Sequence, residues 1–419
     1  MKIALLAAGG PGEVQMFLAL ALGLQHLGHR TVLAASEHAA DEIGSYPVEY
    51  QPLPGGYGEP RLLDCGPIAP SEQYAWHAAL LSSCRDCDAV ICSPALLFEA
   101  GVISESLGKP FMFVLPCPLL PATAAFPQFM VRAKPSSFRM FNRFSHYLFQ
   151  SRHESRRVSD VNVWRIRLGL EPLAGPYFRR LAALKVPVLH AYSPSLVPPP
   201  ADWGRHHFVS GALWIDGSHV SPRAAMPLPD AFARWLEQGS PPVYIAADSL
   251  PAPDTDMRRR IGVAADLAKR LKVRAVIAVD RDAVGPAEEP LTDDVWLTKR
   301  ADPRPILAGC RCAVHSGDAR TTHAAAEAGT PSLICSRAAD QAFWGARIAA
   351  LRIGRHMPAR RAAPERLMRA IRELMPDESM RKRATALGVA IREENGLLYA
   401  LDWVEKQLPD APVFSNEPG

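Results

Sequence analysis

A repeated alternation of short apolar runs with segments of helical periodicity constrains the fold of this chain most strongly. In the first third of the chain, apolar residues recur at helical spacing from Glu13 onward and again near 95–107. The apolar runs there occupy residues 2–8, 31–35, 88–92 and 110–115. Short runs without polar alternation are typical of parallel strands buried on both faces. This part of the chain is therefore expected to form a parallel α/β sheet.

The second half repeats the pattern after an irregular middle. The middle contains a basic helical stretch at 138–168 and a strand at 187–193. Apolar runs then recur at 242–247, 273–279, 294–298 and 310–314. Helical segments are expected near 254–270, 321–328, 340–350, 364–375 and 378–407. Two doubly wound α/β domains are predicted, with a boundary in the proline- and glycine-containing stretch near 205–229.

Composition excludes several classes of protein. Of 419 residues, 48% are hydrophobic and 21% charged, which argues against disorder and collagen-like or disulfide-scaffold folds. The net charge of +4 gives no strong field, so a nucleic-acid partner is not expected. Proline is unusually frequent, at 39 residues. Because hydrophobicity is normal, the prolines are interpreted as marking the boundaries of elements inside a folded protein.

Cysteine spacing and the N-terminus bear on metal binding and location. Cys84-x-x-Cys87 is distant from Cys310-x-Cys312, whose spacing does not complete a zinc site, so no metal is expected. The cysteines are interpreted as thiols in a reducing compartment. The apolar start stops at the glycines and proline of 9–12, and no run approaches 18 apolar residues. A cytoplasmic protein without stable membrane insertion is predicted.

Several motifs resemble one enzyme family. They are His315-Ser316-Gly317-Asp318-Ala319-Arg320-Thr321-Thr322, Ala328-Gly329-Thr330-Pro331, Asp340-Gln341-Ala342-Phe343-Trp344, Gly10-Pro11-Gly12-Glu13-Val14-Gln15, Pro198-Pro199-Pro200-Ala201-Asp202-Trp203, and the segment 387–396. Together they resemble family 1 glycosyltransferases of the GT-B fold, especially bacterial enzymes near the antibiotic and sterol glycosyltransferases. The resemblance implies an α/β protein with two Rossmann-like, doubly wound domains facing across a cleft.

The resemblance also implies roles for the parts of the chain. Residues 1–210 would bind the acceptor, 211–229 would link the domains, and 230–390 would bind the nucleotide sugar. A C-terminal helix at 391–408 is expected to pack back on the first domain, followed by a flexible tail at 409–419.

The loop after the 310–314 strand has a physical reason to bind the donor. It leads into a helix expected near Thr321, a good N-cap residue, and free backbone N–H groups at a helix start suit a phosphate. In the family this loop holds the diphosphate, and Asp340 and Gln341 contact sugar hydroxyls. Alternatively, His315 is a polar strand end and Asp340 a helix cap. The implied donor residues are Gly10, Gly12, Ser249, Trp296, Arg300, His315, Ser316, Gly317, Asp318, Ala319, Arg320, Thr321, Asp340 and Gln341.

The donor loop departs from the family pattern. Ser316 replaces a second histidine, and Asp318 and Arg320 replace glycines. Residues 246–249 read Ala-Ala-Asp-Ser where the family has Gly-Phe-Gly-Ser. A carboxylate about 5 Å from a phosphate costs about 3 kcal/mol at an effective dielectric constant of about 20. Arg320 would offset that cost by pairing with Asp318 or with the phosphate. The departures indicate an unusual donor or a lost one.

Glu13 is the candidate general base. Inverting sugar transfer needs a group that takes the proton of the acceptor hydroxyl as it attacks the anomeric carbon. Relatives often place Asp at the corresponding position. The alternative is a first-turn carboxylate that complements the helix dipole.

Acceptor contacts are expected from Phe126, Phe129 and Phe144, which belong to an aromatic-rich middle region. The alternative is that these rings pack the core of irregular helices. Arginines among them either meet an anionic acceptor or form a solvated helix face.

The sequence therefore predicts an inverting, metal-independent glycosyltransferase that moves a sugar from a nucleotide-diphosphate donor to a small specialised-metabolite acceptor of antibiotic type. No cofactor is expected besides this co-substrate, and the chain is expected to be a monomer or homodimer. One alternative is a catalytically silent homologue that serves as a binding or auxiliary subunit. A dinucleotide-dependent oxidoreductase is disfavoured, because residues 9–12 lack the G-x-G-x-x-G spacing and no acidic residue follows the second strand until Glu37.

Overall fold

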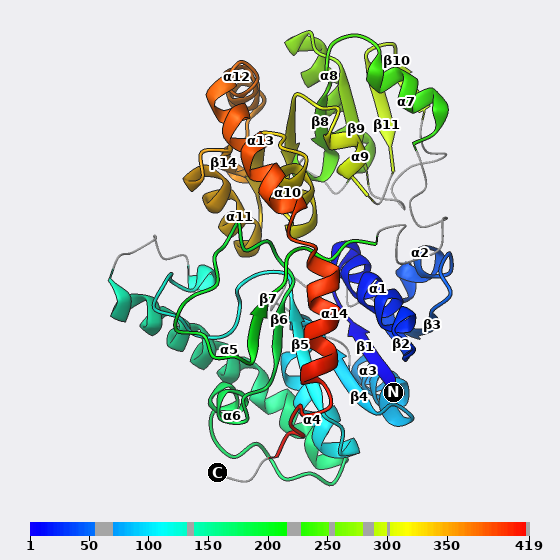
Figure 1. Ribbon diagram of the computed structural model, residues 1–419, viewed down its shortest axis with the longest axis vertical. Helices are drawn as coiled ribbons and strands as arrows, with labels where there is room; N and C mark the ends of the chain where they lie inside the picture. Colours follow the sequence, from blue (N-terminus) through cyan, green and yellow to red (C-terminus); the bar gives the residue numbers. More distant parts are fainter. Residues whose placement is uncertain are drawn as a thin grey trace. The chain divides into compact units, whose positions relative to one another are not determined.

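The chain divides into two compact units. The computed structural model describes residues 1–54, 70–131, 138–215, 228–250, 256–279, 289–299 and 302–415. The first unit comprises Met1–Pro194, Pro198–Met226 and Asn395–Gly419, and the second comprises Ser195–Val197 and Pro227–Glu394 (Figure 1). The chain therefore contributes a short segment and one long segment to the second unit, and it returns to the first unit at Asn395.

The first unit is built on a seven-stranded sheet whose neighbouring strands all pair in parallel. Its strand order is β3-β2-β1-β4-β5-β6-β7. The strands are β1 (Lys2–Ala7), β2 (Arg30–Ser36), β3 (Glu49–Leu53), β4 (Ala89–Cys92), β5 (Phe111–Leu115), β6 (Val188–His190) and β7 (His207–Val209). Crossover segments connect them, as parallel pairing requires. The parallel α/β sheet predicted for this part of the chain is confirmed.

Helices of the first unit alternate with these strands. They are α1 (Pro11–His26), η1 (Glu37–Ala39), α2 (Ala40–Ile43), α3 (Pro70–Arg85), η2 (Pro94–Leu96), α4 (Leu97–Leu107), η3 (Phe129–Val131), α5 (Arg139–Arg167), α6 (Tyr177–Ala183) and α14 (Gly396–Gln407). Helix α1 is buried from Glu13 to Leu24, because it packs between β1, β2 and α14. In the described ranges, no helix combines the length and apolar character needed to cross a membrane.

The second unit repeats the plan with one antiparallel edge. Its strand order is β10-β11-β9-β8-β12-β13-β14, and only the β10–β11 pair among those described is antiparallel. Its elements are α7 (Asp230–Glu237), β8 (Val243–Ala246), η4 (Ala247–Ser249), α8 (Met257–Leu271), β9 (Ala275–Ala278), β10 (Glu289–Thr292), β11 (Val295–Thr298), α9 (Arg304–Leu307), β12 (Cys312–His315), α10 (Ala319–Glu327), β13 (Ser332–Ser336), α11 (Ala339–Ala350), β14 (Gly354–Pro358), η5 (Ala359–Arg361), α12 (Pro364–Leu374) and α13 (Glu378–Arg392). The prediction of two doubly wound sheets is confirmed.

The sequence patterns did not predict the edge strands β3, β7 and β14. β3, β7 and β14 are only partly buried, and their sequences carry polar and charged residues instead of an apolar run. A strand with one solvated side lacks the continuous apolar run that identifies a central parallel strand. The strands that pattern reading identified are the central ones.

The helix predicted at 378–407 is two helices. α13 ends at Arg392 in the second unit, and α14 begins at Gly396 in the first. Asn395 between them has a φ of 45°, a left-handed conformation that interrupts the helix. A Cβ at Gly396 would lie 2.4 Å from the carbonyl oxygen of Ala212, so the backbones approach closely there. The sequence predicted both a helix at 378–407 and a C-terminal helix at 391–408, and the polar residues 392–395 mark the break that neither range placed.

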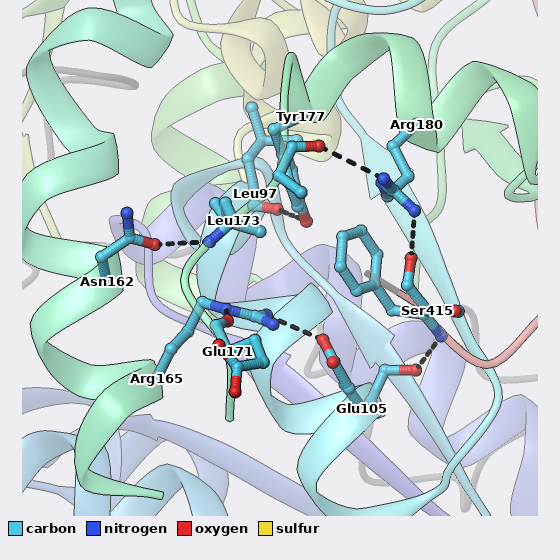
Figure 2. A network of polar contacts seen from close by, with 12 residues as sticks. Leu97, Glu105, Asn162, Arg165, Glu171, Leu173, Tyr177, Arg180 and Ser415 are labelled. Atoms are coloured by element: carbon cyan, nitrogen blue, oxygen red, sulfur yellow. Dashed lines mark hydrogen bonds and ion pairs between the residues drawn. The ribbon is translucent and has the colours of Figure 1, made fainter. Parts of the chain in front are cut away.

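The tail predicted to be flexible is packed as far as Ser415. The Phe111 N–H donates to the Pro412 carbonyl over 3.2 Å, and Arg180 donates to the Ser415 carbonyl over 2.8 Å (Figure 2). Phe414 is 1% exposed, because its ring packs against Tyr177. Burial of this aromatic side chain fixes the segment. The predicted tail residues 416–419 lie outside the described residues.

The predicted linker is partly inside the first unit. Leu213 and Ile215 belong to the first unit's core, whereas 216–227 lie outside the described residues. The seven cysteines in the described part of the chain are buried and form no disulfide. Those seven thiols therefore behave as small core residues.

Candidate functional site

Most predicted donor residues lie at one edge of the second sheet. β8, β12 and β13 are neighbours, and polar residues follow the carboxyl end of each. Because parallel strands end at the same edge, the loops after them gather there. This edge is called the donor edge below, and it consists of residues 247–249, 315–321 and 337–341.

His315 ends β12 with its side chain fully buried. Its Nδ1 atom accepts a hydrogen bond from the Gly317 N–H over 3.2 Å, so the ring proton is on Nε2. Burial lowers the pKa of His315 to about 4, which keeps the ring neutral. Within the described ranges Nε2 has no hydrogen-bond partner. A buried N–H donor in this state suits an anionic or hydroxyl ligand.

Gly317 is required by the shape of the loop. Its φ is 92°, and a Cβ there would lie 2.5 Å from Ile334 and 2.9 Å from the Gln341 carbonyl oxygen. A side chain would therefore be both strained and in collision. This is the one glycine of the family motif that the chain retains, and the geometry explains the choice.

Asp318, and not Thr321, caps helix α10. Its Oδ1 accepts from the Thr321 N–H over 2.8 Å, and the Ser316 hydroxyl lies 3.4 Å from Oδ2. The helix begins at Ala319, two residues before the predicted start. Both Asp and Thr favour the cap position, and the carboxylate gains additionally from the helix dipole. Two of the departures from the family pattern thus form one internal network.

Arg320 interacts electrostatically with Asp302. Burial raises the pKa of Asp302, but hydrogen bonds and charge from Arg304 and the charge of Arg320 hold it below its usual value. The donor edge therefore carries both signs of charge.

The residues after β8 and β13 are tied into their own turns. The Ser249 hydroxyl donates to the Ala246 carbonyl over 2.6 Å, and the side chain is buried. Gln341 Oε1 accepts from the N–H groups of Arg337 and Ala338 over 2.8 and 3.1 Å, which caps α11. Burial raises the pKa of Asp340, and the charge of Asp318 adds to this effect. Asp340 lies inside the first turn of α11, so it is not the N-cap residue.

Three of the predicted donor residues that the structure describes lie outside this edge: Trp296, and Gly10 and Gly12 of the first unit. Trp296 lies within β11 and is 5% exposed, because its indole stacks on Phe232 at 4.9 Å between ring centroids. That stacking makes it a core side chain of the β11–α7 layer. Arg300 lies outside the described residues.

Glu13 sits at the carboxyl edge of the first sheet, in the first turn of α1. Its side chain is 9% exposed, and Oε1 accepts from the Gly9 N–H over 2.6 Å. Burial raises the pKa of Glu13 to about 7, although hydrogen bonds from Ser93 and Gly9 oppose the shift. A carboxyl with this pKa is half ionised near neutral pH, as an efficient general base requires.

Gly9 and Ser93 complete the Glu13 site, and sequence reasoning missed both. A Cβ at Gly9 would lie 2.4 Å from the Glu13 carboxyl carbon, whereas a Cβ at Gly10 would meet nothing within 4 Å. Gly10 precedes α1 as its N-cap, and Gly12 lies in the first turn. Ser93 directly follows β4, the neighbour of β1, and that position was the available signal.

The predicted acceptor residues do not form one cluster. Phe126 lies beside His146 of α5, whose Nε2 is 3.1 Å from the Phe126 carbonyl oxygen. Phe129 is half-buried in η3. Phe144 is exposed and lies two residues before His146, which places it on nearly the opposite side of the helix. Phe144 therefore does not line a common pocket with Phe126.

Two family models and several curated relatives match this chain. Residues 3–105 match the glycosyltransferase family 28 N-terminal domain, and residues 265–395 match the erythromycin biosynthesis protein CIII-like C-terminal domain. A sterol 3-beta-glucosyltransferase of Arabidopsis thaliana is 28% identical over 98% of this chain and 68% of its own. A sterol 3-beta-glucosyltransferase of Aspergillus fumigatus is 28% identical over the whole chain, which spans 30% of that relative.

Solved structures share the fold. The glycotransferase of kitacinnamycin aligns with a TM-score of 0.67 at 18% identity, covering 97% of this chain and 99% of its own. Glycosyltransferase VinC, solved in complex with dTDP, aligns with a TM-score of 0.61 at 16% identity, covering 98% and 99%. The matches extend over both units and agree with the order of the motifs. These matches identify the chain as a glycosyltransferase of the GT-B fold, similar to the family 1 enzymes.

Proposed function

We propose that the protein transfers a sugar, with inversion, from a nucleotide-diphosphate donor to a hydroxyl of a small apolar specialised metabolite. The first unit would hold the acceptor and the second the donor. The proposal includes no metal ion and no cofactor besides the nucleotide sugar. It places the reaction in the cytoplasm.

One observation carries this proposal: the buried Glu13 carboxyl, whose pKa is raised to about 7 at the carboxyl edge of the first sheet. The raised pKa lets Glu13 be ionised before the reaction and hold a proton afterwards. The acceptor hydroxyl would donate its proton to Glu13 while its oxygen attacks the anomeric carbon from the face opposite the leaving diphosphate. General bases contribute roughly 10²–10⁴-fold to such rates.

The donor edge supports the other half of the reaction. The buried Nε2–H of His315 and the N-terminus of α10 are donors suited to the diphosphate. The relatives named as sterol glucosyltransferases, and the structural neighbours named after natural products, favour an apolar acceptor.

A second candidate rests on Asp318. Its carboxylate occupies the N-terminus of α10, where the family pattern has glycine, and bonds the Thr321 N–H. A negative charge at this position opposes a diphosphate. This observation favours a binding or auxiliary protein that has lost the donor.

Calorimetry with UDP, dTDP, UDP-glucose and dTDP-glucose separates the two candidates. The enzyme proposal expects at least one of these to bind the wild-type chain. Each binding donor is then assayed with cholesterol and with an aromatic polyketide aglycone, with and without EDTA. Product formation that EDTA leaves unchanged is expected. Absence of binding by every nucleotide would favour the auxiliary protein.

Glu13→Gln tests the role of the base. The substitution keeps the side-chain shape but removes the basic oxygen, so kcat is expected to fall roughly 10²- to 10³-fold. The donor Kd should stay within about twofold, because Glu13 belongs to the other unit. Unchanged turnover would remove Glu13 from the mechanism.

A further inference from the structure

The N-terminal half of α5 exposes an unusual group of large apolar side chains. Six of them are between 42% and 75% exposed. They are Phe138, Met140, Phe141, Phe144, Tyr147 and Leu148, which together are called the α5 patch. Soluble proteins seldom gather so many exposed apolar side chains without a binding partner.

The α5 patch is not the core-facing side of the helix. At 100° per residue, Met140, Phe144 and Tyr147 lie opposite the buried Asn142 and His146. The buried side already makes core contacts: Asn142 Nδ2 donates to the Ala124 carbonyl over 2.9 Å. The first turns of α5 therefore carry a packed face and, opposite it, a second apolar face that the described residues leave exposed.

The far half of α5 is held rigidly. Arg165 is fully buried; its Nη1 is 2.7 Å from Glu105 of α4, and its Nε donates to the Glu171 carbonyl over 2.7 Å (Figure 2). Asn162 accepts from the Leu173 N–H over 2.9 Å. The patch lies roughly 30 Å along the helix axis from this anchor. It is thus presented at one end of a fixed 29-residue helix.

The exposed charged residues of α5 beside the patch are all arginines. Arg139, Arg143 and Arg152 are exposed beside it, and the first acidic residue of α5 is Glu154. Arg143 also pairs with Asp202 over 3.3 Å. A second copy meeting this face through the same residues would bring Arg139 and Arg152 together, and α5 carries no carboxylate before Glu154 to match them. The charge is complementary to an anionic partner.

We propose that the α5 patch docks the protein on an anionic phospholipid bilayer. Its aromatic and aliphatic side chains would enter the interfacial layer, and the flanking arginines would meet headgroup phosphates. A helix face of Phe, Leu, Met and Tyr bordered by Arg is typical of interfacial attachment. Anionic lipids of the cytoplasmic leaflet strengthen such binding through each basic residue. The docking is separate from sugar transfer and needs no substrate.

Vesicle co-sedimentation of the full chain tests the proposal. Vesicles of phosphatidylcholine with a quarter phosphatidylglycerol should bind it at least about tenfold more tightly than phosphatidylcholine alone, and salt should weaken the binding. Met140→Ser with Tyr147→Ser should reduce binding at least about tenfold. Arg139→Glu with Arg152→Glu should do the same.

Matched variants serve as controls. Leu398→Ser with Tyr399→Ser removes two exposed apolar side chains of α14, and Arg258→Glu with Lys269→Glu makes the same charge change on α8. Both should bind as the wild type does. Thermal melting and nucleotide calorimetry on each variant check folding and keep this test separate from that of the proposed function.

Several results would overturn the docking. They are equal binding to neutral and anionic vesicles, no binding to either, patch variants that bind as well as wild type, and control variants that bind as poorly as patch variants. A wild-type dimer in light scattering that Met140→Ser with Tyr147→Ser dissociates would assign the patch to a second copy instead.

Discussion

Glu13 owes its chemistry to two neighbours, Gly9 and Ser93, and to the loss of water. The Gly9 N–H and Ser93 bond its carboxyl, yet burial outweighs them and the pKa rises to about 7. A first-turn glutamate on an open helix would complement the dipole and stay ionised. The sequence named Glu13, but both readings of it remained open until burial was known.

Gly9→Ala and Gly10→Ala should differ sharply. The Cβ at Gly9 would lie 2.4 Å from the Glu13 carboxyl and force it to move, whereas the Cβ at Gly10 would stand in open space. Steady-state assays should show kcat lowered at least about tenfold for Gly9→Ala only, since a small misplacement of a catalytic group is costly. Equal kcat values would mean that the Glu13 position is not critical.

Glu13→Gln should stabilise the first unit above neutral pH. A carboxyl whose folded-state pKa is raised from 4.5 to about 7 destabilises the fold as pH rises through that interval, because the unfolded chain releases its proton while the folded protein still holds one. Gln does not titrate, so the variant should gain about 3 kcal/mol above pH 7 and almost nothing below pH 4.5. Urea melts across this range measure the difference, and a pH-independent difference would contradict the assigned pKa.

At the scale of elements, the start of α10 shows how one cap alters a binding loop. Sequence placed the helix start near Thr321; the structure starts it at Ala319, with Asp318 bonding the Thr321 N–H. Both residues are good caps, and only the backbone path after Gly317 decides between them. The Asp318 carboxylate stabilises α10, and its negative charge weakens the attraction of the helix N-terminus for a phosphate.

Asp318→Asn should tighten nucleotide-diphosphate binding. Asn keeps a cap oxygen for Thr321 but removes the negative charge, so the Kd for dTDP or UDP should fall roughly tenfold. Asp377→Asn is the matched control, because Asp377 caps α13 through the Met380 N–H in the same way. Calorimetry that shows equal Kd values for Asp318→Asn and the wild type would mean that the carboxylate does not face the diphosphate.

At the scale of the whole molecule, the chain closes the first unit with its last described residues. α14 packs on α1, where a Cβ at Gly23 would lie 2.6 Å from Leu401, and Phe414 then fills the core beside Tyr177. The first unit thus depends on residues about 200 positions beyond its main segment. Periodicity is local and does not report such a return, whereas the family resemblance predicted that a C-terminal helix at 391–408 packs back on the first domain.

Phe414→Ala should destabilise the first unit selectively. Removing a buried aromatic ring costs about 3–5 kcal/mol. Hydrogen exchange followed by mass spectrometry should show faster exchange in β5 and α4 and unchanged exchange in β8 and β12. Val413→Ala, at an exposed neighbour, should change neither unit. Equal protection in Phe414→Ala and the wild type would show that the tail is not needed for packing.

The sequence by itself determined the two mainly parallel α/β sheets, their central strands and the resemblance to glycosyltransferases. Apolar runs such as 110–115 and motifs such as 315–322 carry that information within a few residues, because burial on both faces and loop chemistry leave local patterns. The edge strands β3 and β14 carried no such pattern, since one side of each meets solvent.

Only the tertiary structure decided the states of the site residues. Burial raises the pKa of Glu13 and keeps the ring of His315 neutral. The backbone path after Gly317 makes Asp318 the cap of α10. Sequence spacing shows neither the burial nor the path. The structure also shows that Trp296 lies in the core and that Phe144 lies on an exposed helix face. Local sequence fixes which groups are present, whereas desolvation and hydrogen bonding depend on everything packed around them, and these set the charge and reach of each group.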